Sequence, residues 1–155
     1  MQKKWPIYLL ITCIIVIIES LAIWIGTEEF FNVIHVEGKM VWILHPASRI
    51  FLWFLTTICE IIAVGRVYFW PTSSVRSYMM ILIATYFSLD FIMPLTLSLF
   101  PQEILSPVIF TLLAMMVLTL IILASKKEKI VSFLFLPSLV FMSLRAYFKW
   151  HLLFV

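Results

Sequence analysis

Five long apolar runs, separated by polar breaks, fill almost all of this 155-residue chain. The hydrocarbon core of a bilayer is about 30 Å thick, so a helix rising 1.5 Å per residue crosses it in roughly 20 apolar residues. The chain is 64% hydrophobic and only 12% charged, which leaves too little polar surface to cover a soluble globule. We therefore predict an all-α integral membrane protein, a single membrane domain over residues 1–155 with a five-transmembrane-helix bundle at about 5–25, 50–70, 78–99, 104–124 and 130–153.

Basic residues gather in alternate breaks and predict the orientation of the bundle. Lys3 and Lys4 precede the first run, Arg76 lies in the second break, and the fourth break, 125–129, is Ser-Lys-Lys-Glu-Lys. Lysine and arginine in short loops mark the cytoplasmic side. We expect a cytoplasmic N-terminus, an outside C-terminus and a location in the cell membrane. The net charge of +3 follows from these loops and needs no nucleic-acid partner.

The first outer loop, 26–49, is the longest connection in the chain. Thr27 is a plausible N-cap, so a short helix is expected over 27–34, with an apolar face on the outer interface. The whole loop is expected either to cover the outer mouth of the bundle as a lid or to anchor its edge. Pro94 and Pro137 lie inside the third and fifth runs, where each should kink its helix.

Four ionisable side chains fall inside the apolar runs: Glu19, Glu60, Asp90 and Arg145. A charge at the bilayer centre costs a few kcal/mol or more unless it is paired, hydrated or neutralised. Glu60 is expected near the midplane and the other three in the outer half. Two interpretations stay open: a buried salt bridge from Arg145 to Asp90 or Glu19 that fixes the packing, or a polar pocket whose acidic excess binds a cation or basic ligand or exchanges protons.

The neighbours of the two deeper acids favour a polar, inward-facing site. Thr56 and Thr57 precede Glu60 by one helical turn, and Tyr86 precedes Asp90 by one turn, which places these polar groups on shared faces. The three histidines show no His-x-x-x-His spacing and the two cysteines no Cys-x-x-Cys spacing. Neither a metal site nor a cofactor is expected. Tryptophans and tyrosines near the ends of the runs, Trp70 among them, are expected in the headgroup layer.

From the second run onward the layout resembles the TspO/translocator family of tryptophan-rich sensory proteins. Trp42 is followed by His45-Pro46, Trp53 lies in the next helix, and Pro137, Phe141, Tyr147 and Trp150 are spaced as in the last helix of that family. The doubled proline of the family is absent. The resemblance implies a five-helix bundle that binds porphyrin-like or sterol-like molecules. Acids in the first two runs are instead similar to the emopamil-binding and sigma-2 class of sterol isomerases and amine receptors, which has four helices.

These observations lead to a function hypothesis with two alternatives. The leading hypothesis is a non-enzymatic receptor or carrier for a hydrophobic small molecule, tetrapyrrole-, sterol- or amine-like, in the outer half of the bundle. The alternatives are an assembly subunit, as a homodimer or with a partner membrane protein, and a membrane enzyme acting on sterol or prenyl lipids with Glu60 as acid and base. The expected ligand-binding residues are Glu19, Trp53, Glu60, Tyr86, Asp90, Phe141, Arg145 and Tyr147.

Overall fold

The protein is a helical, membrane-embedded bundle. The computed structural model describes residues 4–25, 35–36, 39–40, 46–99 and 104–154. Within them, four segments are long and apolar enough to cross a membrane: Ala47–Tyr68, Ser74–Met93, Leu105–Ser125 and Lys129–His151. The helices are α1 (Trp5–Ile25), α3 (Pro46–Tyr68), α4 (Ser74–Leu99), α5 (Leu105–Ser125), α6 (Lys129–Leu134) and α7 (Leu136–Phe154).

The helix starts differ from the predicted bounds where polar residues continue a helix beyond its apolar run. The helix α3 begins at Pro46, four residues before the expected start, because proline is well tolerated in a first turn, where its missing N–H has no partner to lose. The helix α4 begins at Ser74 rather than Tyr78. Helices leave the apolar layer with polar turns, so hydropathy alone places these ends too late.

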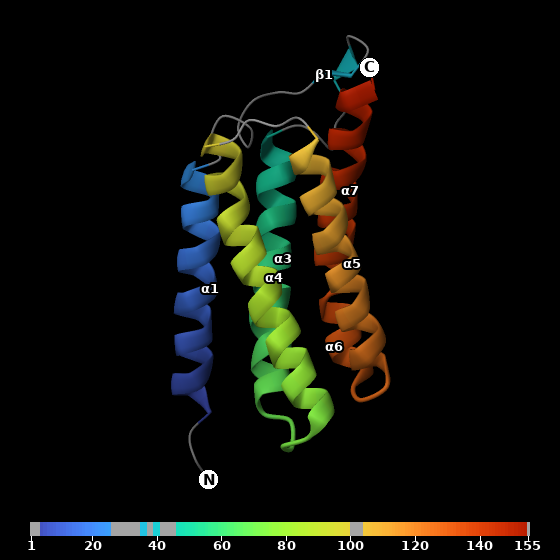
Figure 1. Ribbon diagram of the computed structural model, residues 1–155. Coiled ribbons are helices and arrows are strands. Elements are labelled where there is room, and N and C mark those ends of the chain that lie inside the picture. The colour runs from blue at the N-terminus through green and yellow to red at the C-terminus, as the bar shows by residue number, and fades with distance from the viewer. Residues whose placement is uncertain (1–3, 26–34, 37–38, 41–45, 100–103, 155) are drawn as a thin grey trace.

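The first loop contains a small strand pair that the sequence analysis did not predict. Strands β1 (His35–Val36) and β2 (Lys39–Met40) run antiparallel, with His35 opposite Met40 and Val36 opposite Lys39. The pair lies at the end of the bundle where α7 finishes (Figure 1). The helix expected over 27–34 lies outside the described residues, as does most of the proposed lid.

The last apolar run is divided into two helices. The helix α6 ends at Leu134, Phe135 takes φ −87° and ψ −7°, and α7 starts at Leu136. Pro137 follows at once, and because its nitrogen carries no hydrogen it cannot continue the backbone ladder. The interruption therefore lies where the proline predicts a kink, and it sets Ser138 at the beginning of α7.

A single stripe of α5 forms the centre of the packing. Its buried residues recur every three or four positions, which is the spacing of one helical face: Ser106, Pro107, Phe110, Leu113, Val117, Leu120 and Ala124. The helix α5 packs against α7, α4 and α6, while α3 packs against α7, α6, α4 and α1. Figure 1 shows α1 at one edge of the bundle, beside α4 and away from α5 and α7.

The edge helix α1 approaches α3 closely at one glycine. A Cβ atom on Gly65 would overlap the ring of Tyr8, so any larger residue there would have to displace that ring. Tyr8 also packs on Phe69, with ring centroids 5.5 Å apart. The absence of a side chain at Gly65 is therefore what allows this part of α1 to lie against α3.

Candidate functional site

The centre of the bundle holds a buried carboxyl group shared by three helices. Glu60 on α3 is only 2% exposed. Its Oε1 accepts a hydrogen bond of 3.0 Å from the Tyr86 hydroxyl of α4 and one of 2.7 Å from the Ser138 hydroxyl of α7. Buried polar groups are costly unless hydrogen-bonded. Two neutral donors, one from each of two neighbouring helices, thus stabilise the buried Glu60 carboxyl.

A second buried acid lies one turn further along α4. Asp90 is 4% exposed, and its carboxyl interacts electrostatically with Glu60 and with Arg145. Among the described residues, the structure records no direct ion pair between Asp90 and Arg145. Asp90 and Arg145 therefore interact electrostatically without a recorded ion pair. The alternative salt bridge, from Arg145 to Glu19, lies outside the described side chains.

Arg145 is held mainly by aromatic rings. Its guanidinium carbon lies 4.1 Å from the ring centroid of Phe110 on α5 and 5.4 Å from that of Phe141. An arginine over an aromatic face gains about 0.5–2 kcal/mol, more when the pair is desolvated. The guanidinium also lies within electrostatic range of a second arginine, Arg49, near the start of α3. The recorded contacts of the Arg145 guanidinium are therefore with the two rings, and none is with Asp90.

These four charges follow one another along the bundle, and we call Glu60, Asp90, Arg145 and Arg49 the charged column. Asp90 lies one turn, about 6 Å, beyond the level of Tyr86, and Arg145 lies two turns, about 10 Å, beyond Ser138. Arg49 lies eleven residues, about 16 Å, from Glu60 along α3. The column therefore runs from the middle of the bundle to the end where α7 finishes, with acids deep and bases near the surface.

The threonines before Glu60 do not take part in its hydrogen bonding. The hydroxyls of Thr56 and Thr57 both donate to the backbone carbonyl of Trp53, at 2.7 and 2.9 Å. Both threonines are buried, so this bond within α3 satisfies them. Both threonines lie on the helix turn before Glu60, as predicted, but their hydroxyls are hydrogen-bonded within α3 and do not donate to the Glu60 carboxyl.

The expected site residues divide into three sets. Glu60, Tyr86, Asp90 and Phe141 are buried in the core, and Trp53 and Arg145 are half-buried. Tyr147 does not join them, because it is 62% exposed and its ring stacks on His151, with centroids 6.2 Å apart. The side chain of Glu19 lies outside what the structure describes.

Three residues of the core were not expected from the sequence. Ser138 donates the shorter of the two hydrogen bonds to Glu60, Phe110 carries the guanidinium of Arg145, and Arg49 extends the charged column. The only sequence signal for Ser138 is its position directly after the helix-breaking Pro137. Arg49 stood at the boundary of an apolar run and was assigned to the loop.

A second polar cluster lies at the end of the bundle where α3 and α5 finish, which we call the basic end. Glu128, between α5 and α6, accepts a hydrogen bond of 2.6 Å from Arg66 Nε and one of 2.7 Å from the Trp70 indole, and it forms an ion pair with Arg66. The Trp70 hydrogen bond, followed by those of Arg66 and its charge, lowers the pKa of Glu128 despite opposing desolvation. This carboxylate ties the end of α3 to the connection between α5 and α6.

The side chains of these two clusters can form ion pairs and hydrogen bonds. Among the described residues, no three histidine, cysteine, aspartate or glutamate side chains gather as a metal site would require. No protein-family model matches the chain, and neither does any curated protein or solved structure. The function therefore has to be argued from the geometry of the charged column itself.

Proposed function

We propose that this chain is a multi-pass membrane receptor or carrier for a hydrophobic small molecule that bears a basic amine, with Glu60 as the counterion. The observation that carries the proposal is a carboxyl group 2% exposed at the centre of the bundle and hydrogen-bonded by neutral donors only, among the described residues. Ionisable groups inside membrane helices are expensive and mark ligand, ion or proton pathways by default. Glu60 has the position to bind such a ligand, and its carboxylate would be the counterion of the amine.

The contacts of Glu60 suggest what occupies its carboxyl without a ligand, and the charged column suggests the side from which a ligand enters. Tyr86 and Ser138 satisfy the Glu60 carboxyl while the helices are packed, and the amine of a ligand would share or replace those hydrogen bonds. Asp90, Arg145 and Arg49 continue from Glu60 towards the end of the bundle where α7 finishes. We expect exchange through that end, where the polar groups offset the cost of moving a charge through the apolar core.

The topology proposed for this function is five crossings with the basic end in the cytoplasm. The helix α1 contributes an apolar segment, Trp5–Ile18, beside the four longer ones. The helix α1 begins at the basic end and α7 finishes at the opposite end (Figure 1), which an odd number of crossings requires. Cationic side chains at the basic end support a cytoplasmic location for it: Lys4, Arg66, Arg76, Lys126, Lys127 and Lys129. We propose the cell membrane as the location.

The test compares three ligands of one skeleton on the purified protein. A naphthyl tertiary amine should raise the unfolding temperature, whereas the matching uncharged alcohol and the matching carboxylate should not. The amine effect should disappear in Glu60→Gln, which keeps the shape and hydrogen-bonding capacity of the side chain without its charge. Thr57→Val is the control, because Thr57 is buried one turn away and its hydroxyl is bonded within α3.

Each outcome bears on the proposal. If the carboxylate ligand stabilises the protein and does so in Glu60→Gln as well, the ligand binds at Arg145 and Arg49. The proposal of a basic amine as ligand would then be wrong. A Glu60→Gln protein that does not fold would make Glu60 a structural residue. Stabilisation by none of the three ligands, together with constant co-purification of a second membrane protein, would favour an assembly subunit instead.

A further inference from the structure

We propose that an anionic phospholipid binds between α4 and α5 at the basic end, with one acyl chain in an apolar groove and its phosphate on Lys126 and Lys127. This site is separate from the charged column and does not depend on the proposed function. It rests on two independent features of the described residues: a groove of suitable length and polarity, and cations without acidic partners at its end.

The groove has a volume of about 360 Å³ and lies on the surface that faces lipid. Its α4 side includes Val75, Tyr78, Leu82 and Thr85, and its α5 side is formed by Thr119 and Leu123. Val75 to Thr85 spans ten residues, about 15 Å. That length equals about half of the hydrocarbon core of a bilayer, the depth that the acyl chains of one leaflet occupy.

The lining of the groove is apolar despite its two threonines. The hydroxyl of Thr85 donates to the carbonyl of Ile81 at 2.9 Å, and that of Thr119 donates to the carbonyl of Met115 at 2.9 Å. Both hydroxyls are therefore used within their own helices and present methyl groups to a ligand. A hydrocarbon chain meets no unsatisfied polar group from these threonines.

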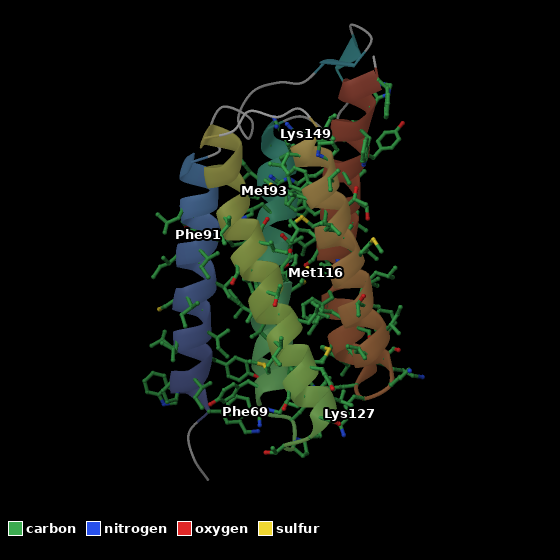
Figure 2. All side chains as sticks on the ribbon, viewed as in Figure 1. Phe69, Phe91, Met93, Met116, Lys127 and Lys149 are labelled. Atoms are coloured by element: carbon green, nitrogen blue, oxygen red, sulfur yellow. The ribbon has the colours of Figure 1, made fainter. Side chains whose placement is uncertain are left out.

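The cations at the end of the groove continue the stripe of α5 that lines it. Thr119, Leu123 and Lys126 follow one another at intervals of four and three residues, which keeps them on one side of the helix as far as its C-cap. Lys127 follows in the turn after α5. Lys126 retains helical angles, with φ −75° and ψ −19°. Both lysines are exposed, and Lys127 lies at the basic end in Figure 2. The phosphate of a lipid in the groove would reach the same level of the membrane as these ammonium groups.

The nearest acid is already occupied. Glu128 directly follows the two lysines, but it accepts hydrogen bonds from Arg66 and Trp70 and forms its ion pair with Arg66. The structure records no ion pair for Lys126 or Lys127 among the residues it describes. Glu128 is thus paired with α3, and no other acid of the described residues is recorded as a partner of the two lysines. The proposed counterion is the lipid phosphate.

The test measures which lipids stay on the protein. The full chain is reconstituted in nanodiscs of phosphatidylcholine and phosphatidylglycerol with the same acyl chains in equal amounts, extracted into detergent and analysed by native mass spectrometry. The wild type should retain phosphatidylglycerol preferentially. Lys126→Gln with Lys127→Gln should lower that preference about 25-fold, since each lysine near an anionic surface contributes about fivefold. Soluble glycerol phosphate should not compete, because it has no chain for the groove.

Three further variants separate binding in the groove from general charge attraction. Thr119→Trp fills the groove without touching the lysines and should also abolish the preference, while Thr119→Val, of nearly equal volume, should retain it. Lys4→Gln removes a cation at the same end but directly before α1, and should change little. Equal losses in Lys4→Gln and in the double variant would reduce the effect to general charge attraction. An unchanged preference in Thr119→Trp, with the protein monodisperse, would exclude the groove.

Discussion

Two glutamates of this protein each accept two side-chain hydrogen bonds, yet their surroundings are opposite. Glu60, in the middle of the bundle, receives both on one oxygen from the uncharged Tyr86 and Ser138. Glu128, at the basic end, receives one on each oxygen, from Arg66 and Trp70. In the apolar core a cation would add its own desolvation cost, whereas near water an ion pair forms at little cost and with little gain. Among the described residues, Glu60 is thus bonded by neutral groups alone, whereas both oxygens of Glu128 are bonded and one of its partners is a cation.

The largest expected effect comes from removing the base nearest the deep acids. Arg145→Leu leaves Asp90 buried without its electrostatic partner and removes the stacking on Phe110, so we expect a loss of about 3 kcal/mol in unfolding free energy. Asp90→Asn in the same protein should recover much of that loss, because the unpaired charge is removed with its partner. Unfolding in detergent with increasing denaturant measures both. If Arg145→Leu is neutral, the guanidinium is solvated and the charged column loses its central base.

Removing the two neutral donors tests the hydrogen bonding of the buried Glu60 directly. Tyr86→Phe and Ser138→Ala should each cost about 1–2 kcal/mol, because each deprives a buried carboxyl of a hydrogen bond. The double variant should cost more than the sum, since both bonds end on the same oxygen. Thr85→Val on the lipid-facing side of α4 is the control and should have little effect. Strictly additive losses would show that the two hydroxyls act independently of each other.

Substitution of Glu128, at the basic end, should lower the unfolding free energy less. Glu128→Gln removes the charge from the Arg66 ion pair but keeps an acceptor for the Trp70 indole, so we expect a loss of about 1 kcal/mol. Salt should reduce this difference, because screening acts on partly exposed pairs. Lys127→Gln, in the same loop, should be close to neutral in neutral detergent. A loss for Glu128→Gln as large as that for Arg145→Leu would abolish the contrast between the two regions.

The smallest expected effect is the pH dependence of that surface contribution. The folded pKa of Glu128 is lowered, first by the Trp70 hydrogen bond and then by Arg66, so ionisation favours the folded state. The contribution is fully present above the ordinary glutamate pKa of about 4.3 and is lost as the pH falls through the lower folded value. The stability difference between wild type and Glu128→Gln should therefore be constant near neutral pH and shrink in acid. A difference that grows in acid would contradict the assignment.

The sequence predicted the helices because membrane spans depend mainly on local hydropathy. Glu60 and Asp90 were identified for the same reason, as charges inside apolar runs. Ser138 was not identified as a partner of Glu60, because the two residues are 78 positions apart and their meeting depends on how α3 and α7 are rotated about their axes. Hydropathy fixes the depth of a residue in the membrane but not the direction in which its helix faces.

The basic-end cluster was missed for a related reason. Trp70 was assigned to the headgroup layer, which was a sufficient explanation for it, and Arg66 was not linked to any partner. Their spacing of four residues places them on one face of a helix end, and Glu128 is the one acid in a loop of lysines. Those two features together could have suggested the contact. The remaining step, which loop lies beside which helix end, required the packing of the bundle.

The close contact at Gly65 has a consequence for the order in which the bundle assembles. The helix α1 is made first, but the notch that receives its Tyr8 ring belongs to α3, which is made later. Helices that insert independently associate afterwards by close packing, often at small residues. In the five-crossing topology proposed above, α1 would remain undocked until α3 has entered the membrane, and Gly65→Leu would leave α1 inserted but undocked. Such a protein would be more sensitive than the wild type to proteolysis in α1 after extraction.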